Sequence, residues 1–505
     1  MIVVLDFGSQ YSQLIARKIR QLNVYTEIAP YNVSIAKLRK MNPEGIVLSG
    51  GPANIYAKGA PRLNKRVLDL GAPVLGICYG MQAIAVAMGG KVDHSDKREY
   101  GHAIVARQEE DALWSGLARK QRVWMSHQDR VAQLPKDFRV LGVTESCPAA
   151  IRHKTRPIYG VQFHPEVHHT THGERMLSNF AIRICGCKAD WRMKDFVERT
   201  VDELREQTDG RRVVCGVSGG VDSTVLAVLL HRAIGDRLAP VFVDNGVLRL
   251  NEAEAVQRSF ASLGIQITMA RSASRFLRKL RGVSHPEQKR KIIGREFIKV
   301  FFERLKPNDL LAQGTLYPDV IESVSTKGPS ATIKTHHNRV KEVLKLIEEG
   351  RVVEPLKELF KDEVREAGRA LGLSKEILWR HPFPGPGLAI RILGAVTPKR
   401  LAMLRQADAI YLEEMKKAGV YYDVWQGFSV LLPVKAVGVM GDERTYEHVL
   451  ALRAVESVDG MTADWSKLPY DLLGRASNRI INEIKGINRV VYDVSSKPPS
   501  TIEWE

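Results

Sequence analysis

Short apolar runs alternate with helical patterns along most of this chain, and this alternation is what most constrains its fold. At its N-terminal end, helices are expected at Gln13–Leu22 and Met81–Met88. Strands are expected at Ile2–Leu5, Gly45–Leu48, Val74–Ile77, Val123–Ser126 and Ile158–Phe163. Parallel strands need a crossover between them, usually a helix, so this succession predicts an α/β domain with a largely parallel sheet.

A second alternating series begins at Arg212, after small and polar residues at Gly186–Asp190 and an expected helix at Phe196–Arg205. Its strands are expected at Val213–Val217, Ala239–Val243, Ile265–Met269 and Leu310–Gln313, and its helices at Thr224–Ile234, Glu252–Leu263 and Ile292–Leu305. Apolar residues recur at helical spacing in the last of these helices, so one of its faces should be core. The series predicts a second α/β domain.

The segment His381–Gly387 marks the next boundary, because its three prolines remove backbone donors and fix φ. Thr397 and Pro398 then suit the cap and first turn of a helix. Beyond the boundary, strands are expected at Leu388–Leu393, Val430–Pro433, Ala436–Val439 and Val490–Val494, and helices at Pro398–Lys417, Tyr446–Val455 and Leu472–Ile484. We therefore expect two parallel-sheet α/β domains, residues 1–187 and 188–380, and a smaller α+β domain, residues 381–505.

The composition is that of a globular protein in a reducing compartment. Of 505 residues, 44% are hydrophobic and 26% charged, which excludes a disordered chain or a fibre. The five cysteines are an odd number and none forms a C-x-x-C pair, which argues against a disulfide framework. The N-terminus lacks the pattern of a signal peptide, and no apolar run reaches 18 residues. We expect a cytoplasmic protein with no membrane partner.

The net charge of +18 favours polyanionic partners, without choosing between nucleic acid and phosphorylated small molecules. Eleven Lys and Arg side chains fall between Arg275 and Lys306. They could bind nucleic acid or simply form a solvated helix face. The nearby aromatics Phe297, Phe301 and Phe302 lie on the apolar face of this helix and would not interleave with the cations. We therefore expect no nucleic-acid partner.

A glycine-flanked cysteine follows the apolar run Val74–Ile77. Gly76 and Gly80 lie two residues to either side of Cys78 and permit a sharp strand-to-helix turn. Such a turn exposes the side chain at a helix N-terminus, where the dipole and free N–H groups favour thiolate. The alternative is a buried structural cysteine, which is the more usual role of this residue.

The segment Phe163–Glu166 favours the catalytic alternative. In an extended chain, His164 and Glu166 point to the same side. A thiolate nucleophile needs a base, and the base needs an orienting partner. Cys78, His164 and Glu166 would together supply a catalytic triad.

These motifs resemble those of class I glutamine amidotransferases, and Asp6–Tyr11 and Ser49–Pro52 resemble the GMP synthetase branch of that family. The resemblance implies that Gly50 and Gly51 lie in a loop whose backbone binds the oxyanion. It also implies that Tyr79 and Gln82 help to hold glutamine. Gln128 departs from the His-Gly-Asp pattern expected at His127–Asp129, which affects the predicted contacts to glutamine there.

The segment Ser218–Ser223 contains two glycines between an expected strand and helix, so its backbone N–H groups can form an anion nest. It lacks the lysine of a Walker loop. The segment resembles the PP-loop of ATP pyrophosphatases, which cleave ATP between the α and β phosphates. The resemblance implies that Asp222 lies near Mg²⁺ and that no prosthetic group is needed. The implied ATP-binding residues are Gly216, Val217, Ser218, Gly219, Gly220, Val221, Asp222, Ser223, Val243 and Lys334.

The resemblance to GMP synthetases extends to the tail, Lys497–Glu505, although Ser500 replaces a smaller residue. It implies that Lys497, Thr501, Ile502 and Glu503 bind XMP and that the third domain forms homodimers. The implied reaction makes GMP from XMP, ATP and ammonia released from glutamine, with AMP and pyrophosphate as products.

Two other interpretations remain at this point. The chain could be another PP-loop enzyme that amidates a different acceptor or modifies tRNA, or it could bind nucleic acid. The cysteine spacing disfavours a tRNA-sulfur transferase. A zinc site at His336 and His337 is rejected, because no third ligand is spaced to complete it.

Overall fold

The structure is a computed structural model that describes all residues except 10, 52–53, 325–340, 441–442 and 458–461. Pro52, Lys334, His336 and His337 therefore lie outside the described residues. The chain divides into two compact units. The first contains Met1–Asp195 and a short segment from Pro318 onward, and the second contains Phe196–Tyr317 and the C-terminal part of the chain. The predicted division of the second unit into two domains stays a prediction.

The first unit contains a nine-stranded sheet in the order β2-β1-β3-β4-β9-β8-β7-β5-β6. The first five strands in this order pair in parallel. They are β2 (Thr26–Pro30), β1 (Ile2–Asp6), β3 (Gly45–Leu48), β4 (Val74–Ile77) and β9 (Ile158–Val161). The side chains of β1, β3, β4 and β9 are largely buried, as expected for parallel strands covered on both faces, while the edge strand β2 is only partly buried. The predicted α/β core is confirmed.

An antiparallel extension, which the sequence did not predict as such, completes this sheet. It consists of β8 (Pro148–His153), β7 (Phe138–Val143), β5 (Lys91–Arg107) and β6 (Lys120–Gln133). β6 alternates buried and exposed residues, and the predicted strand Val123–Ser126 was only part of it. The helices of this unit are α1 (Ser12–Arg20), α2 (Ile35–Met41), α3 (Tyr79–Ala87) and α4 (Gly173–Ser178).

The second unit begins with α5 (Met193–Thr208) and a five-stranded, all-parallel sheet in the order β12-β11-β10-β13-β14. The strands are β12 (Thr268–Arg271), β11 (Leu238–Asp244), β10 (Val213–Gly216), β13 (Leu310–Ala312) and β14 (Val352–Val353). The main helices around it are α6 (Val221–Ile234), α7 (Glu252–Ser262), α8 (Ala273–Leu280), α9 (Pro286–Phe302), α11 (Lys341–Glu348) and α12 (Lys361–Ala370). Ile293, Val300 and Phe301 of α9 are buried, which confirms its predicted core face.

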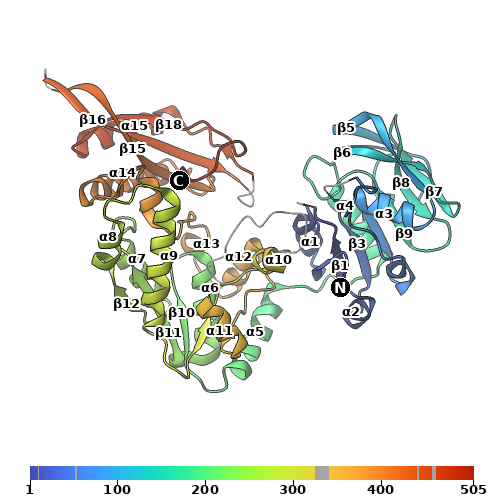
Figure 1. The fold of residues 1–505 in the computed structure, drawn as a ribbon, viewed down its shortest axis with the longest axis horizontal. Helices are drawn as coiled ribbons and strands as arrows, with labels where there is room; N and C mark the ends of the chain where they lie inside the picture. The colour runs from blue at the N-terminus through green and yellow to red at the C-terminus, as the bar shows by residue number, and fades with distance from the viewer. Residues whose placement is uncertain (10, 52–53, 325–340, 441–442, 458–461) are drawn as a thin grey trace. The chain divides into compact units, whose positions relative to one another are not determined.

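The C-terminal part of the second unit is a four-stranded sheet covered by helices (Figure 1). It contains β15 (Gln426–Met440), β16 (Glu443–Glu456), β17 (Asp464–Trp465) and β18 (Ile487–Tyr492). Helices α14 (Pro398–Lys417) and α15 (Tyr470–Glu483) pack against it. Thr397 caps α14 by accepting a hydrogen bond from Arg400 N, as the sequence predicted.

Two predicted elements of this region were wrong. The expected helix Tyr446–Val455 is strand β16, which pairs with β15, β17 and β18. Val449–Val455 are all buried, so this central strand has no alternating pattern of buried and exposed residues. Its Leu and Ala residues have high helix propensity, which favoured the wrong prediction. The expected strand Leu388–Leu393 is a 3₁₀ helix, η6 (Gly387–Arg391), since Gly387 has a φ of +61° and directly follows Pro386.

The expected strands Val430–Pro433 and Ala436–Val439 are one strand, β15. A register shift between Leu431 and Lys435 accommodates Pro433, which cannot donate to the ladder. Among the residues described, no helix has the length and apolar character needed to span a bilayer.

Candidate active sites

Cys78 lies at the turn between β4 and α3 in a conformation that L residues rarely adopt, with a φ of 52° and a ψ of −105°. The residues on either side, Gly76 and Gly80, must be glycines because a Cβ at either position would clash with neighbouring atoms. A Cβ at Gly76 would lie 2.5 Å from the Gly80 backbone, and one at Gly80 would lie 2.4 Å from Leu48 O. The turn is therefore the strained nucleophile elbow that the spacing predicted.

His164 and Glu166 form a buried pair. His164 Nδ1 lies 2.7 Å from Glu166 Oε1, and the two residues are 4% and 1% exposed. Thr170 Oγ1 donates to the His164 carbonyl at 2.6 Å and holds the segment in place. Burial lowers the pKa of His164, but the charges of Glu166 and Cys78 and its hydrogen bonds with them outweigh burial and raise that pKa well above its ordinary value. This environment favours an imidazolium beside the thiol.

The Cys78 thiol has two further neighbours. Its Sγ lies 3.8 Å from the Ser126 carbonyl, and Gln162 Nε2 donates to it at 3.7 Å. Gln162 is fully buried, and its Oε1 has no hydrogen-bond partner among the described residues. Sequence reasoning missed Gln162, although it lies two residues before His164 on the same segment.

Gly50 and Gly51 lie against the predicted triad. A Cβ at Gly50 would lie 3.4 Å from His164 Cε1, and one at Gly51 would lie 2.9 Å from the Tyr79 ring. Ser49 is fully buried, and it fixes the end of β3 by accepting from Phe7 N and donating to Gly50 O. The glycine loop thus lies against His164 and Tyr79, the residue that follows Cys78, and its role as an oxyanion donor stays a prediction.

The polar groups of Tyr79 and Gln82 are used within the domain. Tyr79 OH donates to Pro61 O at 2.6 Å, and burial raises the Tyr79 pKa to about 12. Gln82 Nε2 donates to Asp129 O at 2.9 Å. These contacts fix the loop and strand around the elbow, and a direct role of either side chain in holding glutamine stays a prediction.

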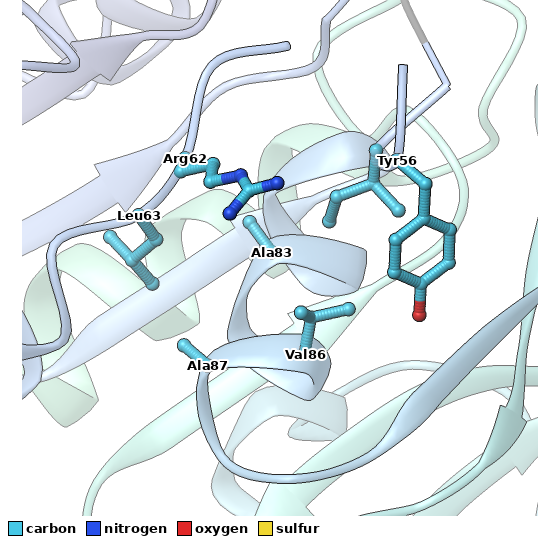
Figure 2. A pocket seen from close by; sticks show the side chains of 7 residues that line it. Tyr56, Arg62, Leu63, Ala83, Val86 and Ala87 are labelled. Carbon is cyan, nitrogen blue, oxygen red and sulfur yellow. The ribbon is translucent and has the colours of Figure 1, made fainter. Parts of the chain in front are cut away.

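A pocket of about 190 Å³ lies beside α3, and none of the predicted site residues lines it. Figure 2 shows Ala83, Val86 and Ala87 of this helix facing Tyr56, Arg62 and Leu63 across the cavity. Its lining is mostly apolar and holds no nucleophile. The pocket is therefore distinct from the predicted glutamine site.

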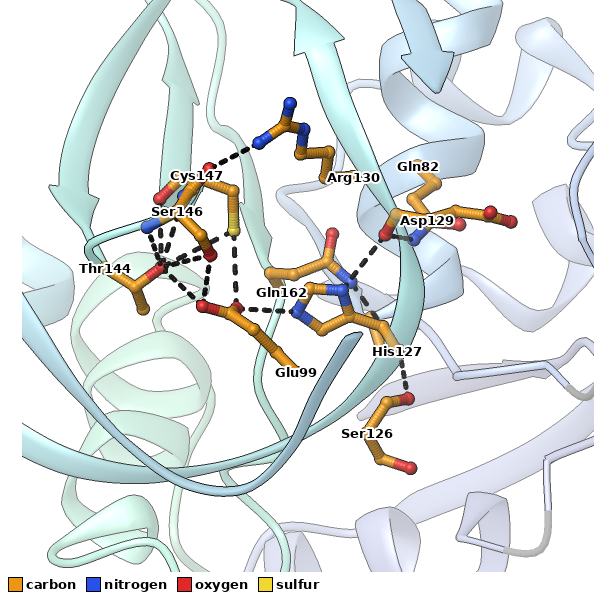
Figure 3. Close-up of polar contacts among 11 residues, drawn as sticks. Gln82, Glu99, Ser126, His127, Asp129, Arg130, Thr144, Ser146, Cys147 and Gln162 are labelled. Atoms are coloured by element: carbon orange, nitrogen blue, oxygen red, sulfur yellow. Dashed lines mark hydrogen bonds and ion pairs between the residues drawn. The ribbon is translucent and has the colours of Figure 1, made fainter. Parts of the chain in front are cut away.

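A buried polar network surrounds His127, the neighbour of Gln128, which departs from the expected His-Gly-Asp pattern. Glu99 contacts both the His127 ring and the Cys147 thiol (Figure 3). Burial lowers the pKa of His127, although Glu99 opposes the shift. Burial raises the pKa of the Cys147 thiol to about 11. Sequence reasoning missed this network, because Glu99 and Cys147 are distant from His127 along the chain.

The predicted phosphate loop connects β10 to the N-terminus of α6. Gly219 has a φ of +72°, and a Cβ there would lie 2.5 Å from Val256. Ser218 N donates to Ser223 Oγ at 3.1 Å, so the loop folds back on the first turn of the helix. The backbone N–H groups of this turn form the type of nest that binds phosphate.

Asp222 lies in the first turn of α6. Its Oδ2 pairs with Lys361 Nζ, while its Oδ1 is buried and has no hydrogen-bond partner within the described part of the chain. Arg380 Nη1 donates to Gly219 O at 3.1 Å. Lys361 and Arg380 thus bring two positive charges to the loop. The sequence motif gave no signal for either residue, because both come from distant segments.

Val243, at the end of β11, is buried beside the loop, and Val217 N donates to Val241 O at 2.9 Å. β10 and β11 are adjacent and parallel, so their carboxyl ends open at the same edge of the sheet. That edge is where open α/β sheets bind ligands. Val243 lies two residues beyond Val241, the partner of Gly216, toward the same edge of the sheet, and its role in binding ATP stays a prediction.

The predicted XMP-binding residues lie in a tail that is tightly held. Arg391 donates two hydrogen bonds to the Glu503 carboxylate, at 2.8 and 3.0 Å, and Gln426 Nε2 donates a third at 2.9 Å. Arg453 donates to the Ile502 and Thr501 carbonyls. Ile502 is 9% exposed and packs on the core beneath β15.

The two ends of the tail are fixed as well. The buried Lys289 of α9 pairs with the Glu505 carboxylate. Lys497 N donates to Ala463 O at 2.7 Å. A frayed terminus is therefore excluded for this segment.

Comparison with known proteins agrees with this division of sites. The family "Glutamine amidotransferase class-I" matches residues 3–184, "NAD synthase" matches residues 191–272, and "GMP synthase C terminal domain" matches residues 413–504. The glutamine-hydrolyzing GMP synthase of Aquifex aeolicus is 55% identical over 510 residues, covering 100% of this chain and 99% of the relative. The enzyme of the same name from Chlorobium chlorochromatii is 55% identical over 513 residues, with the same coverage.

A cysteine-elbow amidotransferase region and a PP-loop region in one chain define an ATP-using ligase that takes its nitrogen from glutamine. The full-length similarity then specifies the family. The chain belongs to the glutamine-hydrolysing GMP synthases.

Proposed function

We propose that this chain makes GMP from XMP, using ATP and ammonia that it releases from glutamine. The observation that supports the proposal is the presence of two reactive turns in one chain. One is a strained cysteine elbow beside a buried His–Glu pair, and the other is a phosphate nest with a buried carboxylate oxygen that has no partner among the described residues.

The first half-reaction uses Cys78, His164 and Glu166. Cys78 Sγ passes its proton to His164 and attacks the carboxamide carbon of glutamine as the thiolate, and the backbone of Gly50 and Gly51 stabilises the oxyanion. His164 donates its proton to the departing ammonia, leaving a thioester on Cys78. His164 then accepts a proton from the water that hydrolyses the thioester to glutamate. Glu166 orients the imidazole and stabilises its charged form.

The second half-reaction uses the Gly216–Ser223 loop. Its N–H groups, with Lys361 and Arg380 nearby, hold the ATP phosphates while the xanthine oxygen of XMP attacks the α-phosphate. Pyrophosphate leaves, and ammonia displaces AMP from the adenylated purine to give GMP.

Mg²⁺ fits this site. Asp222 Oδ1 is a buried oxygen without a partner among the described residues, and Mg²⁺ in phosphate sites is commonly held by one or two carboxylates plus substrate oxygens. When bound, the ion offsets phosphate charge. Asp222 would hold it, while Lys361 neutralises the other carboxylate oxygen.

The experiment that tests this function is a product assay with XMP, ATP, Mg²⁺ and glutamine. We expect GMP, AMP, pyrophosphate and glutamate in equal amounts. Another PP-loop amidating enzyme would form AMP and pyrophosphate only with a different acceptor. Formation of ADP and phosphate would contradict the assignment.

The contacts of the basic segment Arg275–Lys306 support the absence of a nucleic-acid partner. Arg275 donates to Glu296 and Glu303, and Lys279 donates to Glu296. Lys289 is fully buried. Several of these cations are thus already paired or buried. The positive electrostatic potential at the surface of this segment is therefore weaker than its Lys and Arg content suggests. The five cysteines are free of disulfides in the described residues, which supports a cytoplasmic location.

Glu166→Gln should shift the pH dependence of glutaminase activity. Glu166 helps to raise the His164 pKa, so its neutralisation lowers that pKa and His164 loses its proton at a lower pH. The alkaline limb of the profile, measured as glutamate release, should therefore move toward acid, with a modest loss of rate. Glu110→Gln, at an exposed surface pair, is the control. An unmoved alkaline limb would contradict the role given to Glu166.

Deletion of residues 498–505 should raise the KM for XMP much more than the KM for glutamine. The tail packs on the second unit through Glu503, Ile502 and Glu505, far along the chain from the triad. Steady-state kinetics with each substrate varied in turn measures the effect. Equal KM values for XMP with and without the tail would refute a role in XMP binding.

We also propose a homodimer formed through β15 and β16. Val437 and Tyr446 are paired across these strands, and they are 58% and 63% exposed, while Val439 is 73% exposed. An exposed apolar strand pair of this kind is typical of an interaction surface. Sedimentation should give a dimer, and Val437→Asp should shift it toward monomer. Ile104→Asp, at an exposed position of the first unit, should leave it a dimer.

A further inference from the structure

Three buried or half-buried side chains with metal-binding atoms meet beside the glutaminase site, and the proposed function does not use them. They are Glu99 of β5, His127 of β6 and Cys147, which directly precedes β8. One ligand atom of each lies within 4.8 Å of the other two. Figure 3 shows the Glu99 carboxylate between the Cys147 thiol and the His127 ring.

The measured separations fit a tetrahedral metal site. Glu99 Oε2 lies 3.1 Å from His127 Nε2 and 3.6 Å from Cys147 Sγ. For Zn²⁺ with bonds of about 2.0 Å to N and O and about 2.3 Å to S, tetrahedral geometry gives an N···O separation of about 3.3 Å and an S···O separation of about 3.5 Å. The third pair, His127 Nε2 and Cys147 Sγ, lies within 4.8 Å, so the imidazole and the thiol would move toward each other to bind one ion.

The hydrogen bonding of His127 is that of a metal ligand. Its Nδ1 lies 3.1 Å from the Asp129 carbonyl, which can only accept, so Nδ1 carries the proton of the neutral ring. Nε2 then has a free lone pair. His127 is 7% exposed, and its Nε2 faces Glu99 Oε2 at 3.1 Å. Metal-ligating histidines commonly donate the other ring N–H to a carbonyl in this way.

The Glu99 carboxylate is also oriented by its neighbours. Ser146 Oγ and Thr144 Oγ1 both donate to Oε1, the oxygen that does not face His127. These contacts leave Oε2 directed at the thiol and the imidazole. Outer contacts that fix a ligating carboxylate are a usual part of a metal site.

We propose that Glu99, His127 and Cys147 bind one divalent transition metal of the zinc class, with a fourth position open to water. Carboxylate, imidazole and thiolate together suit such an ion and not Mg²⁺ or Ca²⁺. Binding replaces the Cys147 thiol proton, which passes to solvent.

The site is separate from the triad but borders it. Ser126, whose carbonyl faces Cys78 Sγ at 3.8 Å, directly precedes His127 on β6. Asp129, whose carbonyl accepts from both His127 and Gln82, follows it. A metal ion here would therefore fix the strand that lines the nucleophile.

Cobalt titration of the full chain tests this site. The parent is Cys78→Ala, treated with chelator, because the catalytic thiol and His164 could themselves bind metal. We expect one equivalent of Co²⁺ with a thiolate-to-cobalt charge-transfer band. Cys147→Ala in this parent should abolish the band, and Glu99→Gln should weaken binding by about tenfold or more. Cys187→Ala, which removes another buried thiol of the same unit, should leave both unchanged.

Absence of the band in the parent, or its persistence in Cys147→Ala, would overturn the proposal. Circular dichroism, compared with the Cys78→Ala parent, shows whether each variant is folded. If Cys147→Ala does not fold, Glu99→Gln decides the question, because it keeps the thiol and the size of the side chain. Unchanged cobalt affinity in Glu99→Gln would then overturn the site.

Discussion

Cys78→Ala is expected to abolish glutamine-dependent GMP formation and to spare the reaction with ammonium salt. The substitution removes the nucleophile that lies at the elbow beside His164, and neither His164 nor water offers a covalent thioester route. The glutamine-dependent rate should fall by roughly 10⁴-fold or more, the scale seen when a catalytic nucleophile is removed. Parallel assays with glutamine and with ammonium salt at alkaline pH measure the two activities.

Cys187→Ala is the matched control for this substitution. Cys187 is buried in the same unit but takes no part in the proposed chemistry, so both activities should be retained. His164→Ala should behave like Cys78→Ala. Loss of the ammonia-dependent reaction in folded Cys78→Ala would contradict the assignment of two separate sites.

Asp222→Asn is expected to reduce GMP formation from either nitrogen source. It removes the negative charge that would hold Mg²⁺ and breaks the ion pair with Lys361, so the ATP phosphates lose two of their positioning contacts. We expect a loss on the order of a hundredfold or more, since even outer partners of metal ligands contribute about 10- to 100-fold. Pyrophosphate release with XMP and saturating ammonium measures it directly.

Asp236→Asn is the corresponding control. This exposed carboxylate follows the other end of the same helix, α6, and makes no contact with the phosphate loop. Glutaminase activity should survive in Asp222→Asn, because the triad is in the first unit. A normal rate of pyrophosphate release in Asp222→Asn would exclude the role given to this residue.

The two reactive turns could be predicted from sequence because they are local. At Cys78, the flanking glycines and the preceding apolar strand determine the turn almost alone, and the structure shows that a Cβ at either glycine would clash. The same holds at Gly219, whose positive φ the glycine supplies. Motifs of this kind need no knowledge of distant residues.

What sequence reasoning missed depends on tertiary contacts. Lys361 and Arg380 reach the phosphate loop from segments more than a hundred residues away, and Glu99 reaches His127 across a strand pair. Strand β16 was mistaken for a helix because burial on both faces removes the alternation that marks a strand. Its identity is set by pairing with β15 and β18, which no local pattern reports.

The central claim is that nitrogen released at Cys78 enters the purine activated at the Gly216–Ser223 loop. Supplying glutamine with heavy nitrogen in its amide group, together with XMP, ATP and Mg²⁺, tests this claim most directly. Mass spectrometry should find the label in GMP, with one AMP and one pyrophosphate formed for each GMP, and Cys78→Ala should give no labelled GMP. Hydrolysis of the labelled glutamine without labelled GMP, in the presence of intact XMP and ATP, would contradict the account.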